Sequence, residues 1–562
     1  MKTILQKSTL EKDGKFKKYK SSQINRIVLV ILVNFALFSF ANVFGEPIDS
    51  LQKKNTLNEL NLVADTTIES ISLTTNDSFS TIVPSRARNN YSPVKVGPEI
   101  DTIKIVVKAK NASSVLAING TVVNKAVSSV LIPIQSGRNI INIKITAENG
   151  KDSKTVFLKI FRATPYPIWN KIAERSAWIP RDSAGELTFN GQMWLFGGWT
   201  PQLTSDVWHS SDGITWEQAT PIPSKSGIDI PIVFVFNNKI HVQDVSGTLF
   251  TSEDNAKSWT ILADNLPWKK RGQAGCVVFN DKIWVMGGRK GGELLNDVWS
   301  SSDAINWKCE VEHAPWAGRQ FHNAPLVFDD KIWIIGGAMI GSSYHPFLAY
   351  NDVWNSKDGI HWQQVIEHAP WKARIWSFSV VYRNHLWLIG GFRSEPVWEN
   401  LGDVWYSSDG VRWEQLENLP IMQHSGGNNV SVIKNSIWAP RHEMSVYSFN
   451  GKLWVVGGMV WPLVNDVWCL NISGLCFITQ PVWEAYVNTL YEYKAYADFS
   501  EKPQKIKYRL KKSPTWLKIN PVTGMITGTP SKVCDEDIVI EAYNDAGESV
   551  TQKYTLHILP LS

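Results

Sequence analysis

A group of short apolar segments recurs along the middle of this 562-residue chain at a nearly constant spacing. Each segment ends in Trp-x-x-Gly-Gly, and a loop of variable length then leads to Asp-Val-Trp. Five copies are clear, four of them continue through a Ser/Asp turn to another Trp, and their first glycines are Gly197, Gly287, Gly336, Gly390 and Gly457. A period of about 45–55 residues made of short strands is typical of β-propeller blades. The spacing therefore predicts a ring of small antiparallel sheets.

A sixth copy lies between the first two clear ones and has lost most of the repeat's residues. His241 stands where the strand Trp is expected, and Gln243-Asp244-Val245 replaces the glycines. Phe250 replaces the Trp of the triplet, ahead of Trp259. The sequence therefore predicts six blades, of which the second is degenerate.

The two ends of the repeat region complement each other. The last copy stops at Asp466-Val467-Trp468 without a turn or a second Trp. Before the first copy, Trp169 precedes Trp178 by nine residues, the spacing that separates a blade-ending Trp from the next Trp-x-x-Arg elsewhere. A propeller joins its first and last blades, because an open sheet edge invites pairing with other chains. We therefore predict that Trp169 lies on the outer strand of the last blade.

With its Gly-Gly, triplet Trp and final Trp, this repeat resembles the kelch family and the galactose-oxidase-like central domain over about residues 166–475. The resemblance implies a kelch-type propeller, which we expect over residues 164–478. The turns Ser210 to Trp216 and Ser407 to Trp413 also resemble the Asp-box of sialidases, a folding turn remote from chemistry. Kelch propellers serve many functions, so the fold alone assigns none.

Two further β units flank the propeller. Residues 96–163 alternate apolar and polar side chains between Asn-Gly turns, as antiparallel sandwiches do. Through Gly137-x-Asn139-x-Ile141 and Thr146–Gly150 they resemble the cadherin-like β-sandwich domain of bacterial surface proteins, without an Asp cluster for calcium. Residues 479–562 resemble the bacterial putative immunoglobulin-like domain through the run from Trp516 to Pro530. The predicted fold class is all-β: a six-bladed kelch-type β-propeller with an N-terminal and a C-terminal β-sandwich domain.

Residues 1–45 have the pattern of a signal peptide or membrane anchor. Eight Lys/Arg and two acidic residues precede an apolar run over 27–41, which ends in the small-x-small cleavage pattern Ser39-Phe40-Ala41. We expect cleavage after Ala41, and an uncleaved anchor, which would be the chain's one contact with a membrane, stays open. Residues 46–95 are rich in Ser, Thr and Asn, as linkers are. The predicted location is extracytoplasmic: secreted, periplasmic or at the cell surface.

Net charge and cysteine content limit which partners and cofactors are expected. The first 26 residues carry a balance of +6 in a chain of formal charge +5, so the remainder is near −1 and gives no reason to expect nucleic acid. Cys469 and Cys476 lie seven residues apart and either form a local disulfide after export or stay as two buried thiols. No metal-ligand spacing occurs, and the copper ligands of galactose oxidase cannot be mapped. We expect no metal and no cofactor.

Arginines provide the first candidate site. Trp-x-x-Arg recurs just before each inner strand, at Arg181, Arg271, Arg319, Arg374 and Arg441. A cationic ring at one end of the channel would suit carboxylate or sulfate groups, and in kelch propellers that bind acidic ligands arginines at this position line the pocket. The alternative is a brace in which each Arg pairs with the Asp of an Asp-Val-Trp triplet. Both interpretations stay open.

The long blade loops are the other candidate site, because loops differ while the scaffold repeats. Tyr344 and His345 lie in the loop from 338 to 351, and Trp398 lies in the loop from 392 to 402. We predict that these loops and the arginines bind a ligand.

One further group suggests chemistry. Glu443 shares a face of an extended strand with Arg441, and His322 and His442 lie in the same layer. This set loosely resembles the Arg/Glu/His equipment of sugar-acid epimerases built on kelch propellers. We therefore predict an exported or surface binding or adhesion protein, with carbohydrate or a surface polymer as first ligand and a surface protein as second. The alternative is an enzyme acting on an acidic sugar, an epimerase or mutarotase of sialic-acid type; no catalytic residue is assigned.

Overall fold

The computed structural model describes most of the chain beyond residue 64. The described residues are 65–74, 80–82, 85–87, 90–91, 94–98, 100–123, 127–268, 271–322, 324–339, 348–393, 399–416, 438–501 and 504–561. All regular elements within these ranges are strands, so the predicted all-β class is confirmed. They contain no helix long and apolar enough to cross a membrane. The export segment 1–45 lies outside the described residues, as do Tyr344, His345 and Trp398.

The first unit is a sandwich of two sheets. One sheet has the order β2 (Ser80–Ile82), β1 (Ile68–Thr74), β6 (Thr102–Ala109) and β9 (Val127–Pro133). The other has the order β5 (Val94–Val96), β11 (Ser153–Arg162), β10 (Gly137–Thr146), β7 (Val115–Ile118) and β8 (Thr121–Val123), and β3 (Ser85–Ala87) pairs with β4 (Asn90–Tyr91). Alternate residues of each strand point inward, so Ile103, Ile105 and Val107 of β6 are buried in the core.

The expected linker over 46–95 is wrong for its second half. Strand β1 pairs with β6 along its length, and Ile71 and Leu73 are buried in the sandwich core. In β1 the apolar residues alternate with Ser and Thr. These polar residues are typical of linkers but also suit the exposed face of a strand. The sandwich therefore begins near residue 68 and not at 96.

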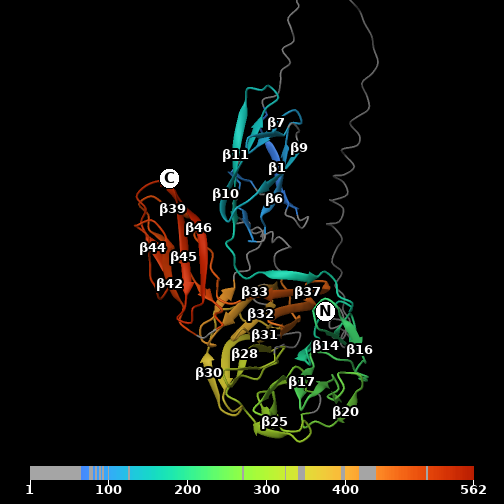
Figure 1. Ribbon diagram of the computed structural model, residues 1–562. Coiled ribbons are helices and arrows are strands. Elements are labelled where there is room, and N and C mark those ends of the chain that lie inside the picture. The colour runs from blue at the N-terminus through green and yellow to red at the C-terminus, as the bar shows by residue number, and fades with distance from the viewer. Residues whose placement is uncertain are drawn as a thin grey trace, which may run out of the picture. The chain divides into compact units, whose positions relative to one another are not determined.

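Six four-stranded antiparallel sheets follow (Figure 1). From inner to outer strand, blades one to six are β13 (Gly185–Phe189), β14 (Gln192–Trp199), β15 (Leu203–Ser210), β16 (Glu217–Ala219); β17 (Ile232–Phe236), β18 (Lys239–Gln243), β19 (Leu249–Ser252), β20 (Thr260–Ala263); β21 (Gly275–Phe279), β22 (Lys282–Met286), β25 (Val298–Ser301), β26 (Lys308–Val311); β27 (Leu326–Phe328), β28 (Lys331–Met339), β29 (Leu348–Ser356), β30 (Trp362–Ile366); β31 (Phe378–Tyr382), β32 (His385–Arg393), β33 (Glu399–Ser407), β34 (Glu414–Leu416); and β35 (Ser445–Phe449), β36 (Lys452–Met459), β37 (Leu463–Asn471), β12 (Trp169–Ala173). Each inner strand contacts the inner strands of both neighbouring blades, so the ring is closed around a channel.

The ring closes as predicted from the Trp spacing. Strand β12 pairs antiparallel with β37, with Trp169 opposite Leu470. Trp169 is buried and packs edge-on against Trp438, with ring centroids 5.8 Å apart. The N-terminal side of the propeller therefore supplies the outer strand of blade six.

Turn glycines pack one blade against the next. In the Asp-box turn of blade five, Asp409 Oδ1 accepts hydrogen bonds from the backbone N–H groups of Val411 and Arg412. Gly410 has φ 73°, and a Cβ there would lie 2.2 Å from the ring of Trp333 in blade four. Only glycine meets both demands. The Asp-box is therefore a structural device, as the sequence indicated.

The degenerate second blade still forms a complete sheet. His241, at the place of the strand Trp, is buried and stacks on Phe234 with ring centroids 4.7 Å apart. Burial lowers the pKa of His241 to about 4, so the imidazole is neutral and serves as an aromatic core residue.

The C-terminal unit is a second sandwich. One sheet has the order β39 (Glu484–Tyr486), β46 (Ser549–Leu559), β45 (Cys534–Tyr543) and β42 (Lys507–Lys512). The other has the order β40 (Tyr491–Lys494), β44 (Met525–Gly528) and β43 (Lys518–Ile519). The short strands β38 (Cys476–Phe477) and β41 (Ala497–Asp498) form a further two-stranded sheet.

In the propeller, β23 (Arg289–Lys290) and β24 (Glu293–Leu294) form a small hairpin in blade three.

Ring closure can be tested at Trp169. We expect Trp169→Ala to lower the free energy of unfolding of the propeller by about 3–5 kcal/mol, because it removes a buried aromatic ring and leaves a cavity. Chemical denaturation followed by tryptophan fluorescence measures this change. Trp461→Ala, at a position 59% exposed, is the matched control and should change stability little. Equal stability of the Trp169 variant and the native chain would contradict the closure.

Candidate functional site

Each of the five recurring arginines is held in a buried ion pair with the Asp of its own blade's triplet. The guanidinium groups are at most 4% exposed. Two parallel hydrogen bonds of 2.5–3.0 Å join each one to its carboxylate, in the pairs Arg181–Asp206, Arg271–Asp297, Arg319–Asp352, Arg374–Asp403 and Arg441–Asp466. We call these pairs the braces.

The brace joins all parts of the repeat. In blade four, Arg319 Nη1 also donates to the carbonyl oxygen of Gly336, and Trp354 Nε1 donates to Asp352 Oδ2 at 2.8 Å. The ring of Trp316 lies 5.9 Å from the Arg319 guanidinium carbon. Trp-x-x-Arg, Gly-Gly and Asp-Val-Trp are therefore the components of one hydrogen-bonded unit. The carbonyl of the first glycine accepts the same bond in every braced blade, at Gly197, Gly287, Gly336, Gly390 and Gly457.

This geometry decides between the two interpretations of the arginines. Burial alone would raise the pKa of Asp403, but the hydrogen bonds and positive charge of Arg374 hold it below its ordinary value. The Nη donors of each guanidinium group are used within its own blade, where they donate to carboxylate and carbonyl oxygens. The arginine ring expected as a ligand site is therefore replaced by the brace.

Blade two lacks the brace. Ile228 occupies the arginine's backbone position, because its N–H donates to Thr204 O as that of Arg319 donates to Leu295 O. The N–H of Gly198 in turn donates to Ile228 O, as that of Gly288 does to Arg319 O. Ile228 is fully buried and has no charge to pair. The degenerate blade therefore keeps the backbone geometry of the repeat without its ion pair.

A cluster of carboxyl groups and imidazoles lies at the channel. Its residues follow the arginine position of the repeat by one to three residues in the sequence. Ser183 Oγ donates to Glu443 Oε1 at 3.1 Å. His322 Nε2 lies 3.6 Å from the same oxygen, and His442 Nε2 lies 3.4 Å from Glu443 Oε2. We call these residues, with Asp182 and Asp229, the channel cluster. The structure thus brings together Glu443, His322 and His442, as the sequence suggested, but places Arg441 in a brace.

Protonation in the channel cluster is set by burial. Burial raises the pKa of Glu443 well above its ordinary value, and the carboxyls of Asp182 and Asp229 raise it further. Burial also raises the pKa of Asp182 to about 7 and that of Asp229 to about 6. It lowers the pKa of His442 to about 3 and, together with the charge of His442, that of His322 well below its ordinary range. Burial therefore favours the neutral forms of Glu443, His322 and His442.

Hydrogen bonds orient the imidazole of His442. Its Nδ1 atom lies 2.7 Å from Asn400 Oδ1, and Asn400 Nδ2 donates to the carbonyl of Met459. The amide oxygen is therefore the acceptor, which assigns the proton of neutral His442 to Nδ1. The lone pair of Nε2 then faces the carboxyl group of Glu443. The ring of Trp376 stacks on that of His442, with centroids 5.0 Å apart.

The backbone of the cluster is held in an uncommon conformation. Ser183, Trp376 and Glu443 have φ of 56°, 55° and 52°, in the left-handed region that side-chain-bearing residues rarely adopt. Glu443 N–H donates to Trp376 O, and Ser183 N–H donates to Glu443 O, so hydrogen bonds run from blade to blade around the channel. Ile230 and Gln273, at the same position in blades two and three, have φ of 42° and 57°, so this conformation belongs to the repeat.

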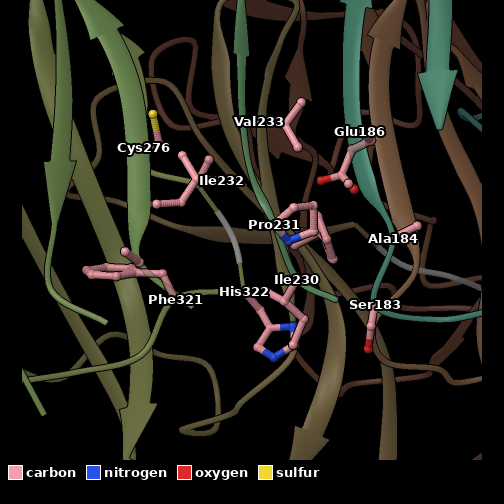
Figure 2. A pocket seen from close by; sticks show the side chains of 14 residues that line it. Ser183, Ala184, Glu186, Ile230, Pro231, Ile232, Val233, Cys276, Phe321 and His322 are labelled. Atoms are coloured by element: carbon pink, nitrogen blue, oxygen red, sulfur yellow. The ribbon is translucent and has the colours of Figure 1, made fainter. Parts of the chain in front are cut away.

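A cavity of about 60 Å³ lies beside the cluster, between the inner strands. In Figure 2, Pro231 and Ile230 lie between the Glu186 carboxylate and the His322 ring. Burial raises the pKa of Glu186 well above its ordinary value, against a hydrogen bond with Ser445. At about 30 Å³ for each water molecule in the liquid, the cavity has room for about two waters. It is too small for a sugar ring.

A larger hollow, of about 380 Å³, opens at the surface of blades five and six. Phe392, Glu399, Asn400 and Trp461 line it, and Trp461 is 59% exposed. Trp461 lies in the tight connection between β36 and β37, with φ 69°. Its ring centroid is 5.8 Å from that of His442, so the wall of this hollow is also a wall of the channel cluster. We call it the Trp461 hollow.

The remaining expectations have mixed outcomes. Cys469 and Cys476 are free thiols, because Cys469 packs with the core between blades six and one while Cys476 packs against a different cluster. No group of His, Cys, Asp and Glu within the described ranges could hold a metal ion. Sequence reasoning missed Asp182, Asp229 and Trp461. A signal existed only for Asp229, which follows the missing arginine of the degenerate blade.

Comparisons with known proteins agree with this organisation. Family models match a cadherin-like β-sandwich domain over residues 65–163, a kelch motif over 270–300 and a putative Ig domain over 477–559. A comparison with curated proteins found no match. Among solved structures, one titled "Structure of YjhT" is similar at 13% sequence identity and a TM-score of 0.42, covering 54% of this chain and 97% of that chain. The family matches confirm the kelch, cadherin-like and immunoglobulin-like resemblances.

The brace can be tested with a double-mutant cycle. We expect Arg319→Ala to lower the free energy of unfolding by about 3–5 kcal/mol, because it leaves Asp352 buried without its partner. Adding Asp352→Ala should recover part of that loss, since the orphaned charge is then removed. Thermal melts measure both, with the exposed Arg175→Ala as control. Unchanged stability of Arg319→Ala would contradict the brace.

Proposed function

We propose that the propeller is a carbohydrate-binding module of an exported or surface protein, and that its ligand lies in the Trp461 hollow. The observation that carries the proposal is the exposed indole of Trp461 beside a hollow of about 380 Å³. Aromatic faces stack on the apolar faces of sugar rings and need little ordering on binding, because a Trp side chain has two rotatable bonds. Most other indoles described here are buried between blades.

Polar groups in the Trp461 hollow suit a hydroxylated ligand. Glu399 forms ion pairs with Arg393 and Lys372, so a carboxylate and two cations meet at its edge. Asn400 is fixed by hydrogen bonds to Pro440 O and Met459 O. A wall of fixed hydrogen-bonding groups around one aromatic face is the composition expected of a small-ligand site.

The flanking domains support an extracytoplasmic location. Family models match a cadherin-like domain over 65–163 and an immunoglobulin-like domain over 477–559, and the first resembles a domain of bacterial surface proteins. The expected export segment at residues 1–45 agrees with this. We therefore propose that the ligand is a carbohydrate or polymer outside the cytoplasm, with a surface protein as the second choice.

The Trp461 hollow makes a direct prediction. Trp461→Ala should raise the dissociation constant for the best glycan of an array at least tenfold, equivalent to about 1.4 kcal/mol, because the stacking face is removed. Trp461→Phe should retain part of the affinity. The matched control is Tyr486→Ala, which removes an aromatic residue 40% exposed on the C-terminal sandwich. Undiminished glycan binding by Trp461→Ala would contradict the proposal.

The channel cluster favours a second candidate function, an enzyme acting on an acidic sugar. A carboxyl group between two imidazoles, here Glu443 between His322 and His442, is suited to general acid–base catalysis, in which one group donates a proton while another accepts one. Opening of a cyclic sugar needs both transfers, a proton to the ring oxygen and a proton from the anomeric hydroxyl. Glu443 is itself buried, so this reaction requires the substrate or a relay to reach it.

The enzymatic candidate is tested by following the anomers of N-acetylneuraminic acid by NMR. Catalysis predicts that the native chain accelerates their interconversion above the buffer rate, and that Glu443→Gln, which keeps the shape but cannot exchange the proton, removes the acceleration. Glu217→Gln, at an exposed position in blade one, should keep it. Interconversion at the buffer rate with the native chain would rule out this function for that substrate.

A further inference from the structure

A second hollow, of about 260 Å³, opens where the degenerate blade two meets blade three. We call it the notch, and the side chains that matter to its chemistry are those of Asp229, Gln243, Asp244, Gln273 and Arg289. It shares Ile230, Pro231 and Ile232 with the small cavity of Figure 2, so its inner wall adjoins the channel cluster.

The notch exists because blade two is shortened. In blade six the second strand continues to Met459, five residues past its Trp, whereas β18 ends at Gln243, two residues past His241. The chain then turns at once, with Asp244 N–H donating to Thr248 O. Both oxygens of Asp244 are used inside this turn and by Ser224 and Ser226. The short turn is therefore rigid, and it leaves open the space that a longer hairpin would fill.

Two acceptors at the notch can take a donor from a ligand. The amide of Gln243 is already used, since it donates to Arg271 O and accepts from Trp268 Nε1. Gln273 Oε1 is buried and has no hydrogen-bond partner among the residues that the structure describes. Asp229 adds a partly exposed carboxyl. Arg271, Arg289 and Gln320 also line the notch, and the oxygens of Gln273 and Asp229 favour a ligand that donates hydrogen bonds.

The charge of the notch is negative. Arg271 lines it, but its charge is offset by Asp297 in a brace. Arg289 is then the cation that faces the carboxylates of Asp229 and Asp244. Burial raises the pKa of Asp229 to about 6, against a hydrogen bond with Ser183, so most of this carboxyl is ionised at pH 7. Asp182 and Glu443 are close enough to interact electrostatically with Asp229, and neither carries a positive charge.

We propose that the notch binds a saccharide unit that carries a free ammonium group, an amino sugar, with the ammonium held by Asp229 and Gln273. An ammonium group offers three donors and a positive charge opposite the carboxylates, and Arg289 supplies a donor for a ring hydroxyl. The inference rests on the proposed carbohydrate-binding function but assigns a site separate from the Trp461 hollow. It also gives the degenerate blade a role, since Gln243, Asp244 and Val245, which replace the repeat glycines, line the notch.

Three monosaccharides with the same ring and different charge test the proposal. Glucosamine, glucose and glucuronate are titrated into the full-length chain at pH 7 and followed by saturation-transfer NMR and calorimetry. The account predicts that glucosamine binds most tightly and glucuronate most weakly. Asp229→Asn should weaken glucosamine binding at least tenfold and glucose binding less than threefold. Asp264→Asn, an exposed carboxylate in the same blade, is the matched control and should change neither.

A second variant and a second readout keep the outcomes distinct. Gln273→Ala should also weaken glucosamine binding, so that a folding defect of Asp229→Asn alone does not decide the matter. Trp461→Ala should leave the glucosamine preference intact even where it abolishes glycan-array binding. Equal affinity for the three sugars, or a glucosamine affinity unchanged by both notch variants, would overturn the inference. Loss of glucosamine binding only in Trp461→Ala would assign that sugar to the other hollow and also overturn it.

Discussion

The propeller depends on one buried ion pair repeated in five of its six blades. Each arginine fork meets a carboxylate with two parallel hydrogen bonds, while its remaining donor holds the carbonyl of the first repeat glycine. The pair is costly to bury and more costly to break, because either charge alone would be left in a medium of low dielectric constant. Its planar, two-point geometry therefore fixes how the inner strands, the glycine turn and the third strand meet.

The groups that we propose for binding and catalysis lie outside the residues that repeat in every braced blade. Ser183, Asp229 and Glu443 follow the brace position and differ in kind from blade to blade, and Trp461 lies in a connection outside the repeat. Blade two, which has Ile228 in place of arginine, is also the blade whose short turn opens the notch. Because five blades keep the brace, the propeller can include one blade that lacks it and has polar side chains at its surface. The repeat therefore explains the fold, and its departures point to binding and chemistry.

The parts of the structure that repeat were predictable from the sequence, because constant spacing encodes constant geometry. The pairing of Trp169 with the last blade followed from a nine-residue spacing, and the brace was one of two interpretations of Trp-x-x-Arg. The grouping of Asp182 with Asp229 was not predictable, since it depends on two different blades facing one channel. The missing bridge between Cys469 and Cys476 has a similar cause, because separation along the chain does not tell which cluster each side chain faces.

Native-state hydrogen exchange of the backbone amides, resolved by blade, tests the central role of the braces most directly. Amides in unstable regions exchange through local openings, whereas those in the most stable elements exchange only on global unfolding. The account predicts that the amides of β18 and β19 in blade two exchange at least tenfold faster than those of the corresponding strands β28 and β29 in blade four. Equal protection of the two blades would contradict the claim that the braces hold the propeller together.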